Sequence, residues 1–233
     1  MNTKIVLSAI CLVSECDEIW SFCYSKEKNV PEDKQGEYGY GSVRTWTAID
    51  PETKLVASWL VGLRDSDYAV AFIDDLASRL ANRVQLTTDG HKCYLETIEN
   101  AFGSQIDYAM LIKLYDNEKP GEFRYSPADF SSTEKKPVNG TPNYKHVSTS
   151  CVERQNLTMR MSMRRFTRLT NGFSKKIENH EHTIALHFMH YNFCRVRQSL
   201  KAPEGKKRTP AMAAGLTKYP WTIRDIVELF ENS

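Results

Sequence analysis

The sequence predicts an α/β fold with a mixed five-stranded sheet and helices on both faces. Up to about residue 62, three short runs of alternating polar and apolar residues are separated by polar turns, which is typical of antiparallel strands. The next part of the chain alternates helical and strand periodicity, which is typical of βα units with parallel strands. With 233 residues, 41% of them hydrophobic, the chain can build a substantial core.

The predicted elements follow from apolar spacing and from turn residues. The predicted strands are 16–24, 43–49, 55–62, 84–89 and 106–115. The predicted helices are 65–80, 94–102, 150–169 and 181–195, with two short helices after residue 209. Asp65 and Ser66 supply a cap for the first helix, and Asn171-Gly172 follows the third.

Residues 116–148 differ in character from the rest of the chain. They hold four of the nine prolines together with Gly, Ser, Thr and Asn, which predicts a long loop. We therefore expect a short N-terminal segment at 1–15, a core at 16–200 that includes this loop, and a basic loop with a helical tail at 201–233.

The order of the elements predicts their arrangement. Three antiparallel strands that lead into βα units place the fourth strand beside the first. This order is the ribonuclease-H-like arrangement.

Charge is unevenly distributed, although the formal net charge is only +2. Residues 1–100 carry 10 Lys and Arg against 16 Asp and Glu, whereas residues 151–233 carry 15 against 7. This asymmetry is typical of a protein that binds metal at one place and a polyanion at another. Six cysteines without a C-x-x-C pair indicate a reduced, cytoplasmic protein, and no apolar run is long enough to predict a membrane span.

Three carboxylates lie on elements that this topology brings together. Asp17 lies in the first strand, Asp89 ends the fourth, and Glu153 lies in the first turn of the helix that begins near residue 150. Converging carboxylates repel one another unless cations neutralise them. Ligands of this type favour Mg²⁺ or Mn²⁺, and two such ions can act together on a phosphodiester. The sequence therefore predicts that the three acids are catalytic metal ligands.

Each acid also has a simpler structural interpretation. Asp89-Gly90 is a common turn pair, and Ser150 with Glu153 fits a helix capping box. Asp17 fits a surface residue beside Glu18. The joint placement of the three acids, followed by a dense run of cations, favours the functional interpretation.

That run of cations contains no acid between positions 154 and 176. A helix that begins with a metal ligand and continues with arginines can hold a phosphate backbone that leads into the site. The predicted nucleic-acid contacts are Arg154, Asn156, Arg160, Arg164, Arg165, Arg168 and Lys175. A second basic patch at 201–208 is equally well explained as a solvent-exposed loop.

Several blocks of sequence resemble the transposases of the bacterial insertion sequence one family. They are residues 16–22, 88–94, 152–160, 164–171, 187–193 and 209–215, in that order. The resemblance covers about residues 15–215, with a departure at Arg197, where relatives commonly have His.

The resemblance implies an Asp-Asp-Glu catalytic core formed by Asp17, Asp89 and Glu153, with Arg160 close to the substrate. It implies hydrolysis at the element's ends, which exposes a 3′-hydroxyl, and direct attack of that hydroxyl on target DNA. The implied partners are double-stranded DNA, as element ends and target, and further copies of the chain on that DNA. The implied cofactor is a pair of Mg²⁺ or Mn²⁺ ions.

Two alternatives remain open. A plain ribonuclease-H-like nuclease would take an acid from the helix after the third strand, either Asp74 or Asp75. A truncated or repurposed remnant would bind DNA through its basic helix without cleaving it.

Overall fold

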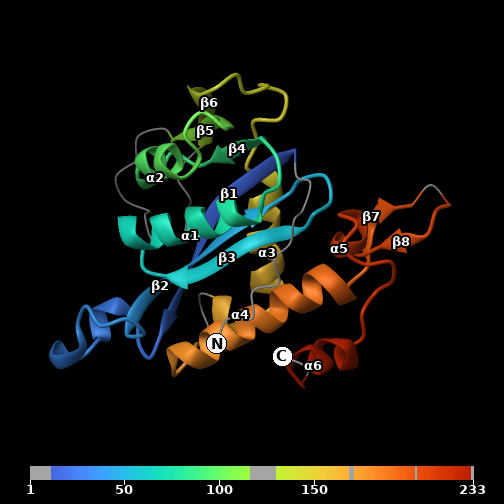
Figure 1. Ribbon diagram of the computed structural model, residues 1–233. Helices are drawn as coiled ribbons and strands as arrows, with labels where there is room; N and C mark the ends of the chain where they lie inside the picture. The colour runs from blue at the N-terminus through green and yellow to red at the C-terminus, as the bar shows by residue number, and fades with distance from the viewer. Residues whose placement is uncertain (1–11, 116–129, 168–170, 203, 232–233) are drawn as a thin grey trace.

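A six-stranded mixed sheet forms the centre of the protein in the computed structural model, with strand order β3-β2-β1-β4-β5-β6 (Figure 1). The described residues are 12–115, 130–167, 171–202 and 204–231. The strands are β1 Val13–Cys23, β2 Gly41–Ile49, β3 Val56–Gly62, β4 Val84–Thr88, β5 Ile106–Tyr115 and β6 Phe130–Asn139. The first three pair antiparallel, whereas β1, β4 and β5 run parallel, which confirms that the fourth strand lies beside the first.

Helices cover both faces of this sheet, as the sequence predicts (Figure 1). The longer helices are α1 Ser66–Arg79, α2 Cys93–Phe102, α3 Ser150–Ser162 and α4 Ile177–Met189. Helices α1 and α2 bury Phe72, Leu76 and Ile98 against one face, in a core centred on Trp46. Helices α3 and α4 bury Met159 and Phe188 against the other face. The two cores pack against β1 from both faces of the sheet, so this strand is a rigid support for the side chains that it carries.

The C-terminal part adds smaller elements beside α4. A π-helix at His190–Cys194 is followed by the hairpin of β7 Arg197–Lys201 and β8 Lys207–Arg208, and then by α5 Pro210–Ala213 and α6 Ile223–Glu231. The remaining short turns are η1 Glu27–Asn29, η2 Glu32–Lys34 and η3 Arg164–Phe166. No helix among the described residues combines the length and the apolar character that crossing a membrane requires.

The predicted loop at 116–148 is corrected by the structure, and so is the number of strands. Residues 130–139 form β6, a sixth strand that pairs antiparallel with β5 at the edge of the sheet. Residues 131–138 are exposed, so β6 lacks the apolar alternation that marks a strand in sequence. Its lysines and Pro137 are typical of edge strands. Residues 116–129 lie outside the described part of the chain.

Three further predicted boundaries differ in the structure. The helix predicted at 181–195 begins earlier, as α4 at Ile177, and after Met189 it continues as the π-helix His190–Cys194. Helix α3 ends at Ser162 rather than near 169, because Met163 is extended and η3 then turns the chain so that Phe166 is buried. Strand β1 begins at Val13, inside the predicted N-terminal segment 1–15, while residues 1–11 lie outside the described residues.

Candidate active site

Asp17 and Asp89 come together through the register of two parallel strands. Cys16 of β1 pairs with Thr88 of β4. Asp17 follows Cys16 within β1, and Asp89 follows Thr88, the last residue of β4. The Asp89 carboxylate then accepts a hydrogen bond from the backbone N–H of His91 (3.0 Å). This local turn fixes Asp89 at the strand end. The sheet therefore places the two acids side by side, and neither is a freely solvated surface residue.

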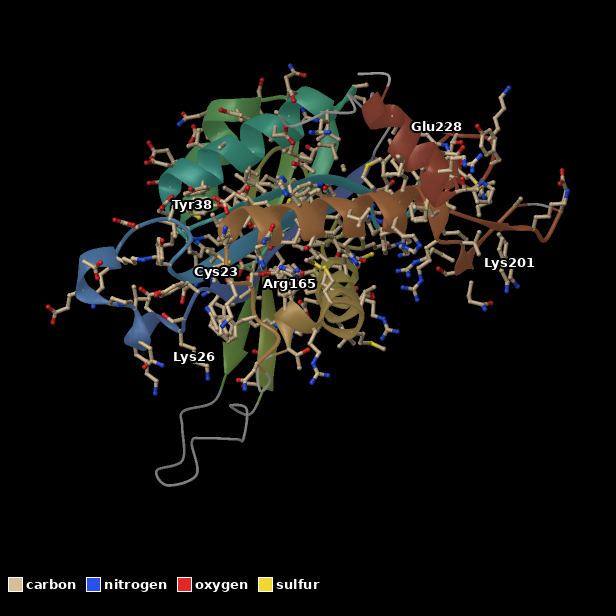
Figure 2. The ribbon with its side chains drawn as sticks, turned by 90° about the horizontal axis from the view of Figure 1, so that it is seen from below. Cys23, Lys26, Tyr38, Arg165, Lys201 and Glu228 are labelled. Atoms are coloured by element: carbon tan, nitrogen blue, oxygen red, sulfur yellow. The ribbon has the colours of Figure 1, made fainter. Side chains whose placement is uncertain are left out.

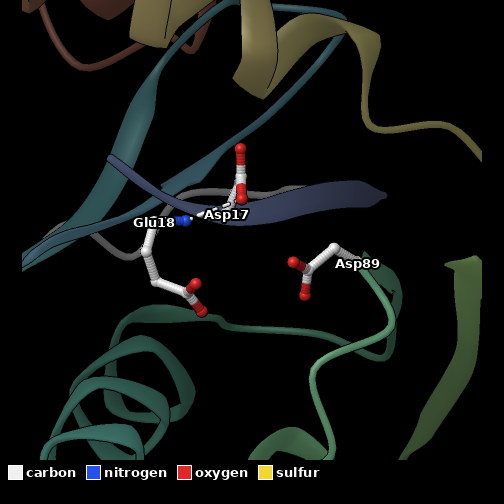
Figure 3. A group of neighbouring side chains, drawn as sticks. All are labelled: Asp17, Glu18 and Asp89. Atoms are coloured by element: carbon white, nitrogen blue, oxygen red, sulfur yellow. Dashed lines mark hydrogen bonds between the residues drawn. The ribbon is translucent and has the colours of Figure 1, made fainter. Parts of the chain in front are cut away.

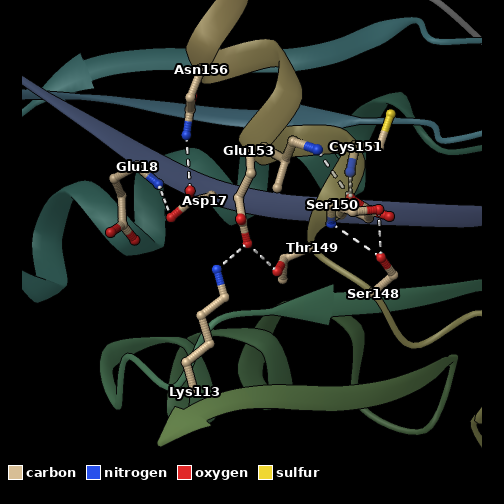
Figure 4. Close-up of polar contacts among 11 residues, drawn as sticks. Asp17, Glu18, Lys113, Ser148, Thr149, Ser150, Cys151, Glu153 and Asn156 are labelled. Carbon is tan, nitrogen blue, oxygen red and sulfur yellow. Dashed lines mark hydrogen bonds and ion pairs between the residues drawn. The ribbon is translucent and has the colours of Figure 1, made fainter. Parts of the chain in front are cut away.

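The Asp17 carboxylate is held at both oxygens. The backbone N–H of Glu18 donates to Oδ1 (2.8 Å), and the side-chain amide of Asn156 on α3 donates to Oδ2 (2.8 Å; Figure 4). Burial, followed by the charge of Asp89, raises the pKa of Asp17 to about 7. A group in this state gains from a cation that favours its charged form.

Glu153 approaches the same region from α3. Its Oε1 accepts hydrogen bonds from the ammonium of Lys113 on β5 (2.5 Å) and from the hydroxyl of Thr149 (2.6 Å; Figure 4). Glu153 also contributes to the raised pKa of Asp17. The ammonium group of Lys113 thus forms an ion pair with the third predicted acid.

The start of α3 is attached directly to β1. Glu15, which is 2% exposed, accepts hydrogen bonds at Oε2 from the backbone N–H groups of Cys151 (2.7 Å) and Val152 (3.0 Å). These are N–H groups that a helix leaves unpaired at its N-terminus. The alternative interpretation of Ser150 and Glu153 as a capping box is therefore not what the structure has, because Glu15 accepts from the first N–H groups of α3 and Glu153 bonds to Lys113 and Thr149.

One open cleft of about 970 Å³ contains all three predicted acids. Asp17, Asp89 and Glu153 are its acidic lining residues. Its cationic residues are Arg64, Lys92, Lys113 and Arg160. A cleft lined by both carboxylates and cations can hold a phosphodiester between metal ions and charged side chains.

The tightest group of carboxylates includes a residue that the sequence did not single out. One oxygen each from Asp17, Glu18 and Asp89 lies within 4.8 Å of the others (Figure 3). The Glu18 side chain is 2% exposed and has Arg64 Nε 3.5 Å from its Oε2, and burial raises its pKa. An all-carboxylate donor set fits Mg²⁺ or Mn²⁺, so the residues present fit the expected metal.

The predicted nucleic-acid contacts fall into separate groups. Arg160 lines the acidic cleft, and Arg154 is exposed on α3. Arg164, Arg165 and Lys175 line a second hollow of about 490 Å³ at the C-terminal end of α3. Asn156 is 6% exposed and bonds to Asp17, so in the structure it supports the acids instead of facing solvent. Arg168 lies outside the described residues.

Arg165 is fixed in the second hollow by a chain of polar contacts. Its Nη1 donates to Ser174 Oγ (2.8 Å), which also contacts Nδ1 of the fully buried His180 (2.8 Å). The other ring nitrogen of His180 contacts Ser21 Oγ on β1 (3.0 Å). The strand that carries Asp17 thus also positions a cation of the neighbouring hollow.

Asp74 and Asp75 lie outside the cleft. Asp75 bonds to Arg79 (2.6 Å) and accepts from Ser58 Oγ (2.8 Å), while Asp74 is exposed. Neither side chain lines the cleft that contains Asp17.

The comparisons with known proteins add little to this geometry. No family model matches the sequence, and no curated protein matches it. A solved piggyBac transposase synaptic complex with hairpin DNA is 11% identical, with 77% of this chain and 45% of that chain covered and a TM-score of 0.35. Argonaute from Marinitoga piezophila, in complex with 5′ OH guide RNA and target DNA, is 10% identical, with 66% and 27% covered and a TM-score of 0.29. This chain thus spans less than half the length of either protein.

Proposed function

We propose that the protein is the catalytic core of a DNA transposase with a ribonuclease-H-like fold, in which Asp17, Asp89 and Glu153 act with two Mg²⁺ or Mn²⁺ ions. The observation that carries the proposal is the shared cleft. Two aspartates from neighbouring parallel strands and one glutamate from a helix line it together with Arg160 and Lys113. The blocks of sequence that resemble transposases of the insertion sequence one family contain these three acids.

The chain's own residues perform distinct tasks in this proposal. Asp17 within β1 and Asp89 directly after β4 would hold the metal, and Asn156 keeps Asp17 oriented. Arg160 and Lys113 hold non-bridging phosphate oxygens of the DNA, because both line the cleft that contains the acids. When bound, the ions supply activation of the attacking oxygen and stabilisation of the leaving oxygen.

Two displacements on phosphorus follow. In the first, water attacks, the bond to the 3′ oxygen breaks, and a 3′-hydroxyl and a 5′-phosphate remain. In the second, this hydroxyl attacks a phosphodiester of target DNA, so that one phosphorus–oxygen bond forms as another breaks. The bond count is conserved, so strand transfer needs no further energy source and no covalent bond to the protein. Because two ends are joined to one target in the family that the sequence resembles, we propose that at least two copies of the chain act together on the DNA.

The test compares acid variants with a matched acid outside the cleft. Purified wild type, Asp17→Asn, Asp89→Asn, Glu153→Gln and Asp75→Asn are incubated with supercoiled plasmid and Mg²⁺ or Mn²⁺. A labelled duplex with a free 3′-hydroxyl is added in parallel to detect strand transfer. We expect roughly 100-fold or greater loss of nicking and transfer in the three cleft variants, and nearly normal activity in Asp75→Asn.

Two outcomes contradict the proposal. Normal nicking by Asp89→Asn removes the metal-ligand assignment. Cleavage of an RNA–DNA hybrid, abolished by Asp75→Asn and with no action on duplex DNA, favours the ribonuclease instead. Mg²⁺-dependent thermal stabilisation is measured on the same variants, so that loss of metal binding is distinguished from misfolding.

A further inference from the structure

A basic β-hairpin extends from the body of the protein beside α5 (Figure 1). It consists of β7 Arg197–Lys201 and β8 Lys207–Arg208, which pair antiparallel. Just beyond the paired residues, the backbone N–H of Ala202 donates a hydrogen bond to the carbonyl of Lys206 (2.9 Å). None of its residues lines the acidic cleft or the second hollow, so the hairpin is a separate surface.

The base of the hairpin is firmly attached. The guanidinium of Arg197 lies 4.4 Å from the centre of the Tyr191 ring and donates to the Tyr191 hydroxyl (3.1 Å). Leu200 is 6% exposed and Thr209 is fully buried at the two ends of the ribbon. Arg197, which departs from the family's usual His, therefore anchors the hairpin to the π-helix. Figure 2 shows Lys201 on this hairpin.

The strand register places like charges opposite one another. Arg197 pairs with Arg208 and Lys201 pairs with Lys207, with an irregularity in the register between the two pairs. Arg208 also donates a hydrogen bond to the carbonyl of Lys201 (3.3 Å). Like charges directly opposite in a ribbon destabilise it. Residues 195–208 contain six Lys and Arg but only one acid, Glu204, whose contact with Lys206 is 4.0 Å long between highly exposed side chains. Such an exposed contact compensates little of the repulsion.

We propose that this basic hairpin is a second binding surface for duplex DNA, which contacts phosphates outside the catalytic cleft. The inference rests on the proposed function for its substrate, because DNA engaged in the cleft continues past it. A polyanion relieves the repulsion between the paired cations, and releases counterions as it binds. A two-stranded ribbon also fits the major groove of DNA. The exposed side chains of the hairpin, such as Gln198 and Ser199, are polar, whereas a protein interface would have an apolar or aromatic centre.

The test removes one cross-strand pair of lysines from the full-length chain. The variant is Lys201→Ala with Lys207→Ala, and its matched control is Lys26→Ala with Lys28→Ala, two exposed lysines in another part of the molecule. Binding to a fluorescein-labelled duplex of about three helical turns is measured by anisotropy over a series of NaCl concentrations, without divalent cation so that no strand is cut. The wild type and the control are measured in the same series.

We expect the hairpin variant to bind about tenfold more weakly at low salt. The slope of log K against log [salt] is negative, and its magnitude should be smaller by about 2 in this variant, which is roughly 0.9 for each lost phosphate contact. Its melting temperature stays equal to that of the wild type or rises, because a repulsive pair is removed.

An affinity and a slope equal to those of the control overturn the proposal. It is also overturned if poly-L-glutamate competes as well as duplex DNA at equal charge, since the hairpin would then suit an acidic protein equally well. Plasmid nicking by the wild type is read in parallel. If the hairpin variant has a reduced slope but the wild type nicks no plasmid, the proposed chemistry is wrong and the DNA-binding hairpin stands. If the wild type nicks plasmid but the slope of the variant is unchanged, the hairpin proposal is wrong and the proposed chemistry stands.

Discussion

Asp17 is a carboxylate in a place where ionisation is costly. It is partly buried, lies beside Asp89, and has only neutral N–H donors on its two oxygens. Burial and the charge of Asp89 therefore raise its pKa to about 7. The protein tolerates this cost at the strand edge because the same side chain is the natural ligand for a divalent cation.

Replacing Asp17 with Asn should stabilise the metal-free protein at high pH. The folded state has a pKa of about 7 against 3.8 for an unperturbed Asp, so it binds the proton more readily than the unfolded state. Stability is therefore lost as pH rises from about 4 to 7, by at most about 4 kcal/mol. Urea unfolding of Asp17→Asn should show the gain at pH 8 and almost none at pH 4.

Mg²⁺ supplies the control for this prediction. The ion should stabilise the wild type at pH 8 and leave Asp17→Asn nearly unaffected. A variant that gains equally at both pH values would show that the ionisation of Asp17 is not the cause.

The cleft residues that strand order brings together were predictable from the sequence, whereas those whose role depends on the direction of a side chain were not. Asp17 and Asp89 follow from strand order, because the fourth strand lies parallel to the first and Cys16 is opposite Thr88. Lys113 carries no signal in a strand of mixed character, since its role depends on the position of α3 across the cleft. Glu18 was treated only as a neighbour of Asp17, because alternation along a strand assigns adjacent residues to opposite faces.

At the level of elements, the N-terminus of α3 is fixed by a buried contact from β1. Glu15 accepts from two N–H groups in the first turn of the helix, and its negative charge faces the positive end of the helix dipole. Burial raises the pKa of Glu15, while these two backbone hydrogen bonds lower it. The contact fixes where α3 begins, and hence where Glu153 enters the cleft.

Glu15→Ala should therefore destabilise the fold by about 2–4 kcal/mol, because two buried N–H groups lose a charged acceptor. Chemical denaturation at pH 8 measures the loss. The control is Glu15→Gln, which keeps an oxygen acceptor and should cost less than half as much. DNA nicking should fall in Glu15→Ala even where the variant is folded, since Glu153 shifts with the helix. Equal stabilities of Glu15→Ala and the wild type would contradict this assignment.

Element boundaries were harder to predict than element types. The apolar positions of α1 and α2 define amphipathic helices, and both exist close to the predicted bounds. The end of α3 could not be predicted, because the chain turns at Met163 to bury Phe166 beside His180 rather than at a Gly or Pro. Strand β6 is specified by pairing with β5, which leaves no periodic trace in its exposed sequence.

For the whole molecule, the order of strands and helices was predictable, and the side-chain contacts that connect the sheet to the helices were not. Strand order follows from connection rules that need only the sequence of strands and helices. The joint between β1 and α4 instead runs through His180, whose two ring nitrogens contact Ser21 and Ser174. A buried histidine in a helix is indistinguishable in sequence from a solvent-exposed one, so this joint appears only in the structure.

The His180 joint makes the stability of the whole fold sensitive to acid. Burial, together with the charge of Arg165, lowers the pKa of His180 to about 4, against 6.5 for a free histidine. The unfolded state therefore takes up a proton first, and the free energy of unfolding falls as pH drops from about 6.5 to 4, by at most about 3 kcal/mol. His187, whose pKa is also lowered to about 4, acts in the same direction.

Unfolding by urea at a series of pH values tests this in the Asp17→Asn background, which removes the opposing effect of that carboxylate. The parent should lose stability steadily from pH 6.5 to 4. His180→Gln should be less stable than the parent at pH 7, since it keeps only part of the hydrogen bonding of His180. Its loss of stability on acidification should be smaller than the parent's by roughly the contribution of one histidine, because His187 is then the remaining histidine of the two whose pKa is lowered to about 4. His187→Gln serves as the matched variant. A His180→Gln protein that follows the parent's full acid slope would show that the joint between β1 and α4 does not control how the molecule responds to acid.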